Sequence, residues 1–86
     1  MFVILSYDIG AKRVQKALKI CRKYLRHMHR SVFEGNISEG KLNQLKRELE
    51  RVVNTRHDTV CIYRIESPML VKKEQIGVIH DVSEII

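Results

Sequence analysis

The chain begins with a short segment that is apolar on both of its alternating faces. Residues 2–7, Phe-Val-Ile-Leu-Ser-Tyr, carry apolar or weakly polar side chains throughout, and the carboxylate of Asp8 follows directly. The run is far too short to span a membrane. A strand that is apolar on both faces is typical of the centre of a sheet that is covered on both sides. We therefore expect residues 2–7 to form a central strand with both faces buried.

Two helices are predicted from the spacing of apolar residues further along the chain. Apolar positions recur with a helical period between Val14 and Leu25, after Gly10 has ended the first strand. The same period returns between Leu42 and Val53, and Ser38 is the expected N-cap of this second helix. Each helix is amphipathic, so each needs an apolar surface on which to pack.

Runs of β-forming residues surround these helices. We expect extended structure at residues 27–37, as one bent strand or two short ones, and strands at residues 59–65 and 75–80. The order predicts an α+β fold, a ferredoxin-like βαββαβ sandwich with an extra C-terminal strand. No linker or repeat divides the chain, so residues 1–86 are expected to form a single domain.

This architecture predicts a homodimer. Two helices cover one face of the sheet, whereas the first strand is apolar on both faces, and monomers generally avoid such an exposed patch. A two-fold dimer packed sheet against sheet would cover it. We expect residues 75–86, which follow a loop containing Pro68, to dock on the partner subunit.

Asp8 stands before a long basic stretch. No acidic residue occurs between Asp8 and Glu34, and this interval holds eight of the chain's 16 Lys and Arg residues, namely Lys12, Arg13, Lys16, Lys19, Arg22, Lys23, Arg26 and Arg30. An Asp in this place commonly caps a helix. It is also a ligand for Mg²⁺, which takes one or two carboxylates besides waters and phosphates. A dimer axis near the strand end would supply a second Asp8, so we expect a metal ligand, with capping open as a further role.

The basic stretch predicts a surface for nucleic acid. The net charge is +6 and the pI about 9.6, which favours polyanionic partners. The stretch lacks the acids that would pair with its cations at i,i+4, so a phosphate-facing surface is favoured over a merely solvated helix face. The candidate contacts are Lys12, Arg13, Lys16, Lys19, Arg22 and Arg30. No membrane partner is predicted, and the chain, which shows no secretory leader, is expected in the cytoplasm.

Five other side chains are interpreted as structural or remain open. Phe33 stacks on a base or belongs to the core. His27 and His29, two residues apart, would share one face of a strand as polar residues, since two histidines rarely define a metal site. Cys21 and Cys61 are expected to be reduced, buried apolar residues.

The motifs together resemble the small CRISPR-associated adaptation protein family, whose members partner the spacer integrase and are labelled endoribonucleases. The similarity spans essentially the whole chain and is carried by Tyr7-Asp8-Ile9, Lys12-Arg13, residues 21–24, Ser31-Val32-Phe33-Glu34-Gly35, Ile62-Tyr63 and Ile76-Gly77. The resemblance implies a ferredoxin-like homodimer with the last strand on the partner's sheet. It implies Mg²⁺ or another divalent cation between the two Asp8 carboxylates, with Asp8 as metal ligand and catalytic group. Arg13 matches a basic position associated with nuclease function, and Phe33 matches the aromatic residue of the family motif.

The function implied is metal-dependent endonuclease activity on single-stranded RNA or on DNA, together with bridging of integrase dimers during spacer acquisition and integration. Two other readings stay open. The chain is a non-catalytic DNA-binding scaffold of the spacer-integration complex, or it is a stand-alone, toxin-like ribonuclease. The apolar tail at residues 82–86 would either dock the integrase or pack within the homodimer.

Overall fold

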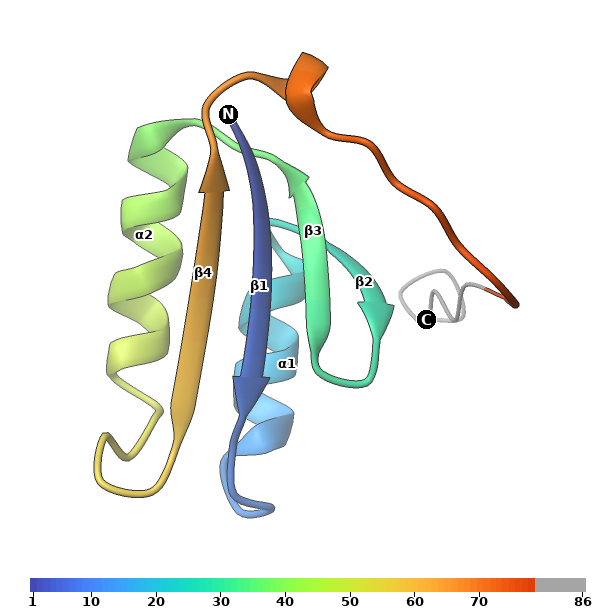
Figure 1. The fold of residues 1–86 in the computed structure, drawn as a ribbon. Coiled ribbons are helices and arrows are strands. Elements are labelled where there is room, and N and C mark those ends of the chain that lie inside the picture. Colours follow the sequence, from blue (N-terminus) through green and yellow to red (C-terminus); the bar gives the residue numbers. More distant parts are fainter. Residues whose placement is uncertain (79–86) are drawn as a thin grey trace.

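The computed structural model describes residues 1–78, which form a four-stranded antiparallel sheet with both helices on one of its faces (Figure 1). The elements are β1 (Phe2–Asp8), α1 (Val14–Arg22), β2 (Arg26–His29), β3 (Val32–Asn36), α2 (Glu39–Glu50), β4 (Thr59–Ile65) and a 3₁₀ turn, η1 (Pro68–Leu70). The strand order is β2-β3-β1-β4. The predicted ferredoxin-like α+β fold is confirmed.

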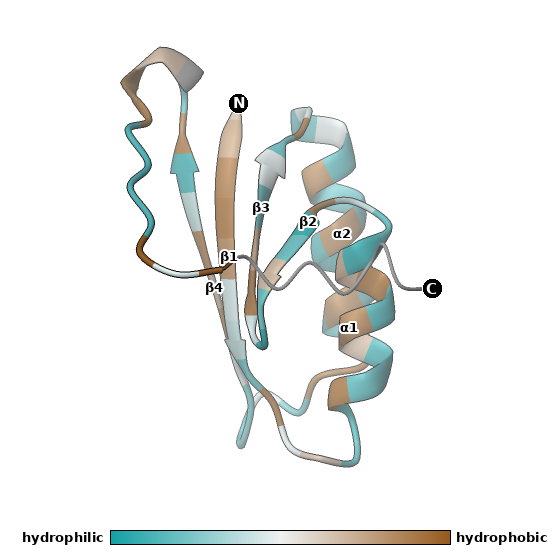
Figure 2. Cartoon of the chain, turned by 90° about the vertical axis from the view of Figure 1, so that its right-hand side faces the viewer, coloured by the Kyte–Doolittle hydropathy of each residue, from teal (hydrophilic) through white to brown (hydrophobic). Residues whose placement is uncertain are grey.

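Strand β1 occupies the centre of the sheet, as its two apolar faces predicted. It pairs with β3 on one side and with β4 on the other. Val3, Leu5 and Tyr7 are buried beneath the helices, whereas Phe2 and Ile4 lie half-buried on the opposite face. Figure 2 shows the helices on one side of the sheet and mainly apolar colouring along β1. The sheet face without helices is called the open face below.

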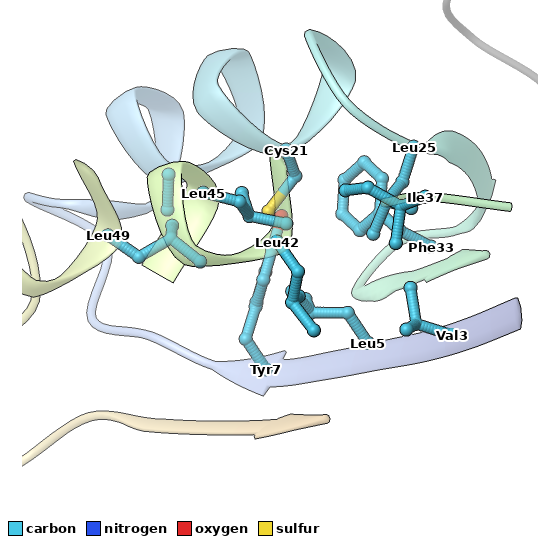
Figure 3. Packing of buried hydrophobic residues seen from close by; sticks show 11 residues of the cluster. Val3, Leu5, Tyr7, Cys21, Leu25, Phe33, Ile37, Leu42, Leu45 and Leu49 are labelled. Atoms are coloured by element: carbon cyan, nitrogen blue, oxygen red, sulfur yellow. The ribbon is translucent and has the colours of Figure 1, made fainter. Parts of the chain in front are cut away.

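The core lies between the sheet and the helices. Figure 3 shows side chains of β1 meeting those of α2, with Cys21, Leu25, Phe33 and Ile37 closing the layer. The cluster comprises Val3, Leu5, Tyr7, Ala17, Cys21, Leu25, Phe33, Ile37, Leu42, Leu45 and Leu49. Burial raises the pKa of the Cys21 thiol to about 12, so Cys21 acts as a small apolar residue. Cys61 is also a free thiol, half-buried on β4.

Short-range hydrogen bonds fix the start of α2 and the end of α1. The Ser38 hydroxyl accepts a hydrogen bond from the Lys41 N–H at 3.2 Å, which confirms the predicted cap of α2. Helix α1 ends at Arg22, earlier than its apolar period suggests. The amides of Tyr24 and Leu25 both bond the carbonyl of Cys21, at 3.1 and 2.9 Å, which closes a turn before β2. Leu25 therefore reaches the core from a turn rather than from a helix.

Residues 27–37 form two strands rather than one bent strand. A β-bulge interrupts the pairing of β2 with β3 between His27 and His29. His27 is therefore buried opposite Phe33, whereas His29 is exposed opposite Val32. The prediction that the two histidines share a face is wrong, because the bulge shifts the alternation by one residue.

The segment after β4 crosses to the open face. Figures 1 and 2 show it leaving η1 on the side of the sheet opposite to the helices, and Lys73 forms an ion pair with Glu34 of β3. Residues 75–78 belong to no strand of the described chain, and the rest of the predicted strand, at 79–80, lies outside the described residues. Docking of residues 75–86 on a partner stays a prediction. Among residues 1–78, no helix has the length and hydropathy needed to cross a membrane.

Candidate active site at the end of the central strand

Asp8 is the last residue of β1 and is exposed. It follows Phe2, Ile4 and Ser6 in the alternation of the strand, so it lies on the open face. Its neighbour in the ladder is Thr59, the first residue of β4. The Asp8 carboxylate makes no hydrogen bond or ion pair with any residue in the part of the chain that the structure describes. An unpaired anion therefore stands at the end of a rigid strand.

Asp8 does not cap α1. The residue in the N-cap position is Arg13, and no side chain accepts a hydrogen bond from the first turn of the helix. The helix instead begins on the carbonyl of Gly10, which accepts from the N–H groups of Arg13 and Val14 at 2.9 and 3.0 Å. The capping role left open for Asp8 is thus excluded, and its carboxylate remains available for a ligand.

The loop between β1 and α1 is held instead by Asp58, a residue that was not predicted from the sequence. Its carboxylate has no exposed area and accepts four hydrogen bonds. Oδ1 accepts from the Gly10 N–H at 2.9 Å and from Arg13 Nη2 at 2.8 Å. Oδ2 accepts from Arg13 Nε at 2.6 Å and from the Asn54 N–H at 2.8 Å. The two loops at this end of the sheet are therefore joined by one buried carboxylate, called the Asp58 clamp below.

The clamp shifts the pKa values of both partners in the direction that favours their charged forms. The Arg13 guanidinium and then the backbone N–H groups of Asn54 and Gly10 lower the pKa of Asp58 well below its usual range, against the opposing effect of burial. The bond to Asp58 raises the pKa of Arg13. Asp58 therefore stays ionised in the folded chain to a lower pH than an ordinary Asp side chain does.

Asp58→Asn should remove an acid-sensitive part of the stability. Because the pKa of Asp58 is lower in the folded chain than in the unfolded chain, its stabilisation is complete at neutral pH and declines as the pH falls below about 4. We expect wild type to be more stable than the variant by a constant amount between pH 7 and 5, and by less at pH 3. Urea unfolding at these three pH values measures the gap, with the exposed Glu66→Gln as control. A gap that is unchanged at pH 3 would contradict the assignment.

The Asp8 carboxylate fits a divalent cation. It is a hard oxygen donor in contact with solvent, and nothing within the described residues competes for it. One chain supplies too few ligands by itself, since no group of three or more His, Cys, Asp or Glu side chains within residues 1–78 could hold an ion. A second Asp8 from a partner subunit would bring the number of carboxylates to two, which is usual for Mg²⁺.

Three predicted nucleic-acid contacts form an exposed basic row. Lys12 lies in the turn before α1, and Lys16 and Lys19 lie on the helix surface, away from the sheet. None of the three forms an ion pair within residues 1–78, whereas Lys23, at the end of the helix, is paired with Glu48. These three lysines, called the basic row below, are therefore free to contact phosphates.

Arg30 and Arg22 take different positions in the fold: Arg30 lies at the end of the sheet where Asp8 lies, whereas Arg22 is the last residue of α1. Arg30 is exposed in the turn between β2 and β3, at the same end of the sheet as Asp8, because the Tyr7 N–H donates to the neighbouring carbonyl of Ser31 at 3.0 Å. The Tyr7 hydroxyl donates to the Arg30 carbonyl at 3.4 Å, and burial raises its pKa, so it remains a donor. Arg22 is half-buried, and its Nε has no partner within the described chain. Of these two arginines, Arg30 is the one that is exposed at the end of the sheet where Asp8 lies.

Phe33 and Arg13 depart from their predicted roles. Phe33 is fully buried, stacked on His27 with ring centroids 4.5 Å apart and tilted against Tyr7 at 5.8 Å. Its prediction as a nucleic-acid contact is wrong, because a ring enclosed in the core cannot stack on a base. Arg13 is committed through Nε and Nη2 to Asp58. Its contact with nucleic acid stays a prediction.

Comparison with known proteins identifies the family of this chain. The model of the family described as CRISPR associated protein Cas2 matches residues 1–73. The chain belongs to the Cas2 family. Its relatives include the CRISPR-associated endoribonuclease Cas2 of Thermotoga maritima, 44% identical over 91% of this chain and 90% of that protein. The protein of the same name from Frankia alni has the same identity and coverage. A crystal structure of Cas2 superimposes with a TM-score of 0.82 at 33% identity, covering 92% of this chain and 88% of the other.

Proposed function

We propose that this Cas2 family member is a metal-dependent endonuclease that acts as a homodimer on single-stranded RNA, on DNA, or on both. The observation that carries the proposal is Asp8 at the end of the central strand, exposed on the open face of the sheet and without a partner among residues 1–78. The names of the Thermotoga maritima and Frankia alni relatives, which describe endoribonucleases, support the same activity.

The open face supports the homodimer. Phe2, Ile4, Val32 and Ile65 are only half-buried on it, and 57% of the Tyr63 side chain is exposed. These residues adjoin one another, because Ile4 pairs with Tyr63 and Phe2 with Ile65 across β1 and β4. A contiguous apolar surface of this kind is commonly covered by a partner. Packing of two open faces about a two-fold axis near the ends of β1 would bring the two Asp8 carboxylates together.

Ile4→Lys should disrupt the dimer while leaving the fold of the chain intact. Ile4 lies in the middle of the open face, between Glu34 and Tyr63, so the lysine is solvated in a monomer but buried in a sheet-to-sheet dimer. We expect the dissociation constant to rise by about 100-fold or more, since burying a charge costs several kcal/mol. Sedimentation equilibrium measures it, with Gln44→Lys on α2 as a control of equal charge. Unchanged dimerisation would contradict the proposed interface.

The proposed chemistry is phosphodiester hydrolysis. The two Asp8 carboxylates of the dimer would hold Mg²⁺ or another divalent cation, which would supply charge neutralisation at the phosphoryl group and would lower the pKa of water. The chain's own residues hold and orient the substrate. Lys12 and Arg30 are exposed cations on two of the loops at the strand end, and they neutralise the phosphates of a bound strand. Asp8 makes no hydrogen bond or ion pair within residues 1–78, so its carboxylate is open to the cation.

The test is a cleavage assay on single-stranded RNA and on single- and double-stranded DNA of matched sequence. Reactions contain Mg²⁺, Mn²⁺ or EDTA. We expect cleavage that requires the divalent cation and stops with the chelator. Cleavage that persists in EDTA, or no cleavage of any substrate by the folded dimer, would contradict the proposed activity.

A second function rests on the basic row. Lys12, Lys16 and Lys19 lie on the helical layer, remote from the open face, so they can contact a duplex while the dimer interface is occupied. We propose that the homodimer also binds DNA as the bridge between integrase dimers in spacer acquisition and integration. On this proposal binding depends on the lysines and not on Asp8.

Charge reversal in the basic row should weaken duplex binding and reduce its salt dependence. Each phosphate contact that is lost lowers the slope of log K against log salt by about 0.9, so Lys16→Glu with Lys19→Glu should lower it by about 2. Titration of a labelled duplex between 50 and 200 mM salt measures the slope. Lys46→Glu, an exposed lysine on α2, is the matched control. An unchanged slope in the double variant would place the DNA elsewhere.

A further inference from the structure

The Asp58 clamp is connected to Asp8 in two ways, through the strand that pairs with Asp8 and through the loop that follows it. Asp58 precedes Thr59, which is the ladder neighbour of Asp8. It also holds the N–H of Gly10, two residues after Asp8, at 2.9 Å. The backbone that leaves Asp8 and the backbone that pairs with it are therefore both fixed to one buried carboxylate.

The close packing at Gly10 supports a precise geometry. A Cβ atom at this position would lie 2.6 Å from Arg13 Nη2 and 3.6 Å from Asp58 Oδ1. The guanidinium cannot move aside cheaply, because two of its nitrogens are bonded to Asp58. Only glycine therefore lets the loop after β1 approach the clamp this closely.

The clamp also separates the charges of this region. Arg13 follows Asp8 by five residues and carries the opposite charge. In the structure the guanidinium is bonded to Asp58 through Nε and Nη2, and only 29% of the Arg13 side chain is exposed. Asp8 consequently has no partner within residues 1–78. A buried carboxylate that satisfies Arg13 leaves the exposed carboxylate free.

We propose that Asp58, through Gly10 and Arg13, is the positioning residue of Asp8: it fixes the orientation of the strand end and so sets the affinity of the site for a divalent cation. The proposal rests on the proposed function, since it assigns the cation to Asp8. Partners that orient a metal ligand typically contribute 10- to 100-fold to metal affinity, which is the order of effect expected here.

Two single variants with opposite changes of charge distinguish positioning from simple electrostatics. Asp58→Asn removes a negative charge near Asp8, and through-space attraction alone predicts weaker cation binding. Arg13→Gln removes a positive charge, and the same argument predicts tighter binding. Positioning predicts weaker binding in both variants. The double variant keeps the net charge and leaves no buried ion without its partner, so it provides a folded protein if either single variant fails to fold.

The readout is the Mg²⁺ concentration that half-saturates the shifts of the Asp8 and Thr59 backbone amides in the NMR spectrum of the homodimer, measured without nucleic acid. We expect about 10-fold weaker binding in both single variants and no further loss in the double variant. Glu48→Gln is the matched control, since Glu48 pairs with Lys23 and Tyr24 at the opposite end of α1. It should lose stability without losing Mg²⁺ affinity.

The outcomes separate this inference from the activity. Three results would overturn the positioning role while leaving the metal at Asp8. They are tighter Mg²⁺ binding in Arg13→Gln than in wild type, wild-type Mg²⁺ affinity in the double variant, and a loss of Mg²⁺ affinity in Glu48→Gln equal to that in the single variants. A wild-type protein whose Asp8 amide does not respond to Mg²⁺ would overturn the proposed metal site, and the positioning role with it.

Discussion

Asp8→Asn should lower the rate of Mg²⁺-dependent cleavage by about 100-fold or more, without unfolding the protein or dissociating the dimer. The size follows from the several kcal/mol that a bound cation contributes to stabilising a transition state, of which about 1.4 kcal/mol corresponds to each factor of ten. The side chain is exposed and has no partner in the described part of the chain, so the free energy of unfolding should change by less than about 0.5 kcal/mol. The rate is measured on single-stranded RNA and DNA under single-turnover conditions.

The matched control for this variant is Glu50→Gln, which removes an exposed carboxylate of α2 instead. It should cleave at the wild-type rate. Cleavage by Asp8→Asn at that rate would exclude Asp8 as the metal ligand. The variant also separates cleavage from DNA bridging. Both proposals expect duplex binding to persist in Asp8→Asn. Spacer acquisition that also persists would mean that bridging needs no cleavage.

Phe33→Ala should cause the largest loss of stability of any single change discussed here. The ring is fully buried, stacked on His27 and packed on Tyr7, and Phe→Ala in a core costs about 3–5 kcal/mol. Small domains have about 5–15 kcal/mol in total, so we expect a largely destabilised or unfolded chain. Urea unfolding followed by circular dichroism gives the free energy.

Two comparisons interpret that result. Phe33→Leu, which keeps an apolar side chain, should retain the fold and wild-type affinity for single-stranded nucleic acid. Met69→Ala, at a side chain that is 91% exposed, should change the stability by less than about 0.5 kcal/mol. A Phe33→Leu protein of normal stability that no longer binds nucleic acid would instead restore the base-stacking role that burial excludes.

The elements set by local patterns could be predicted from the sequence. The doubly apolar run identified β1 as central, and the β-rich run at residues 59–65 matches β4 (Thr59–Ile65). The Ser38 cap was also predictable, because its hydroxyl bonds an N–H only three residues away. In each case the determining residues are close in sequence.

The features that could not be predicted depend on distant pairs or on broken alternation. The Arg13–Asp58 pair joins residues 45 apart, so no local spacing reveals it. Its only signal is a lone acid directly before a strand. The bulge between His27 and His29 defeats the period-two rule on which their shared face was predicted. The candidate site was therefore predicted at Asp8, whereas the Asp58 carboxylate that bonds the nearby Gly10 N–H was not predicted.

Counting the cations bound per dimer tests the central claim most directly. Free Mn²⁺ is measured by electron paramagnetic resonance during titration of the wild-type homodimer and of Asp8→Asn. If the two Asp8 carboxylates share one ion, wild type binds one Mn²⁺ per two chains at the tight site, and Asp8→Asn binds none there. One tight ion per chain, or a tight site that survives in Asp8→Asn, would contradict a shared metal site at the end of the central strand.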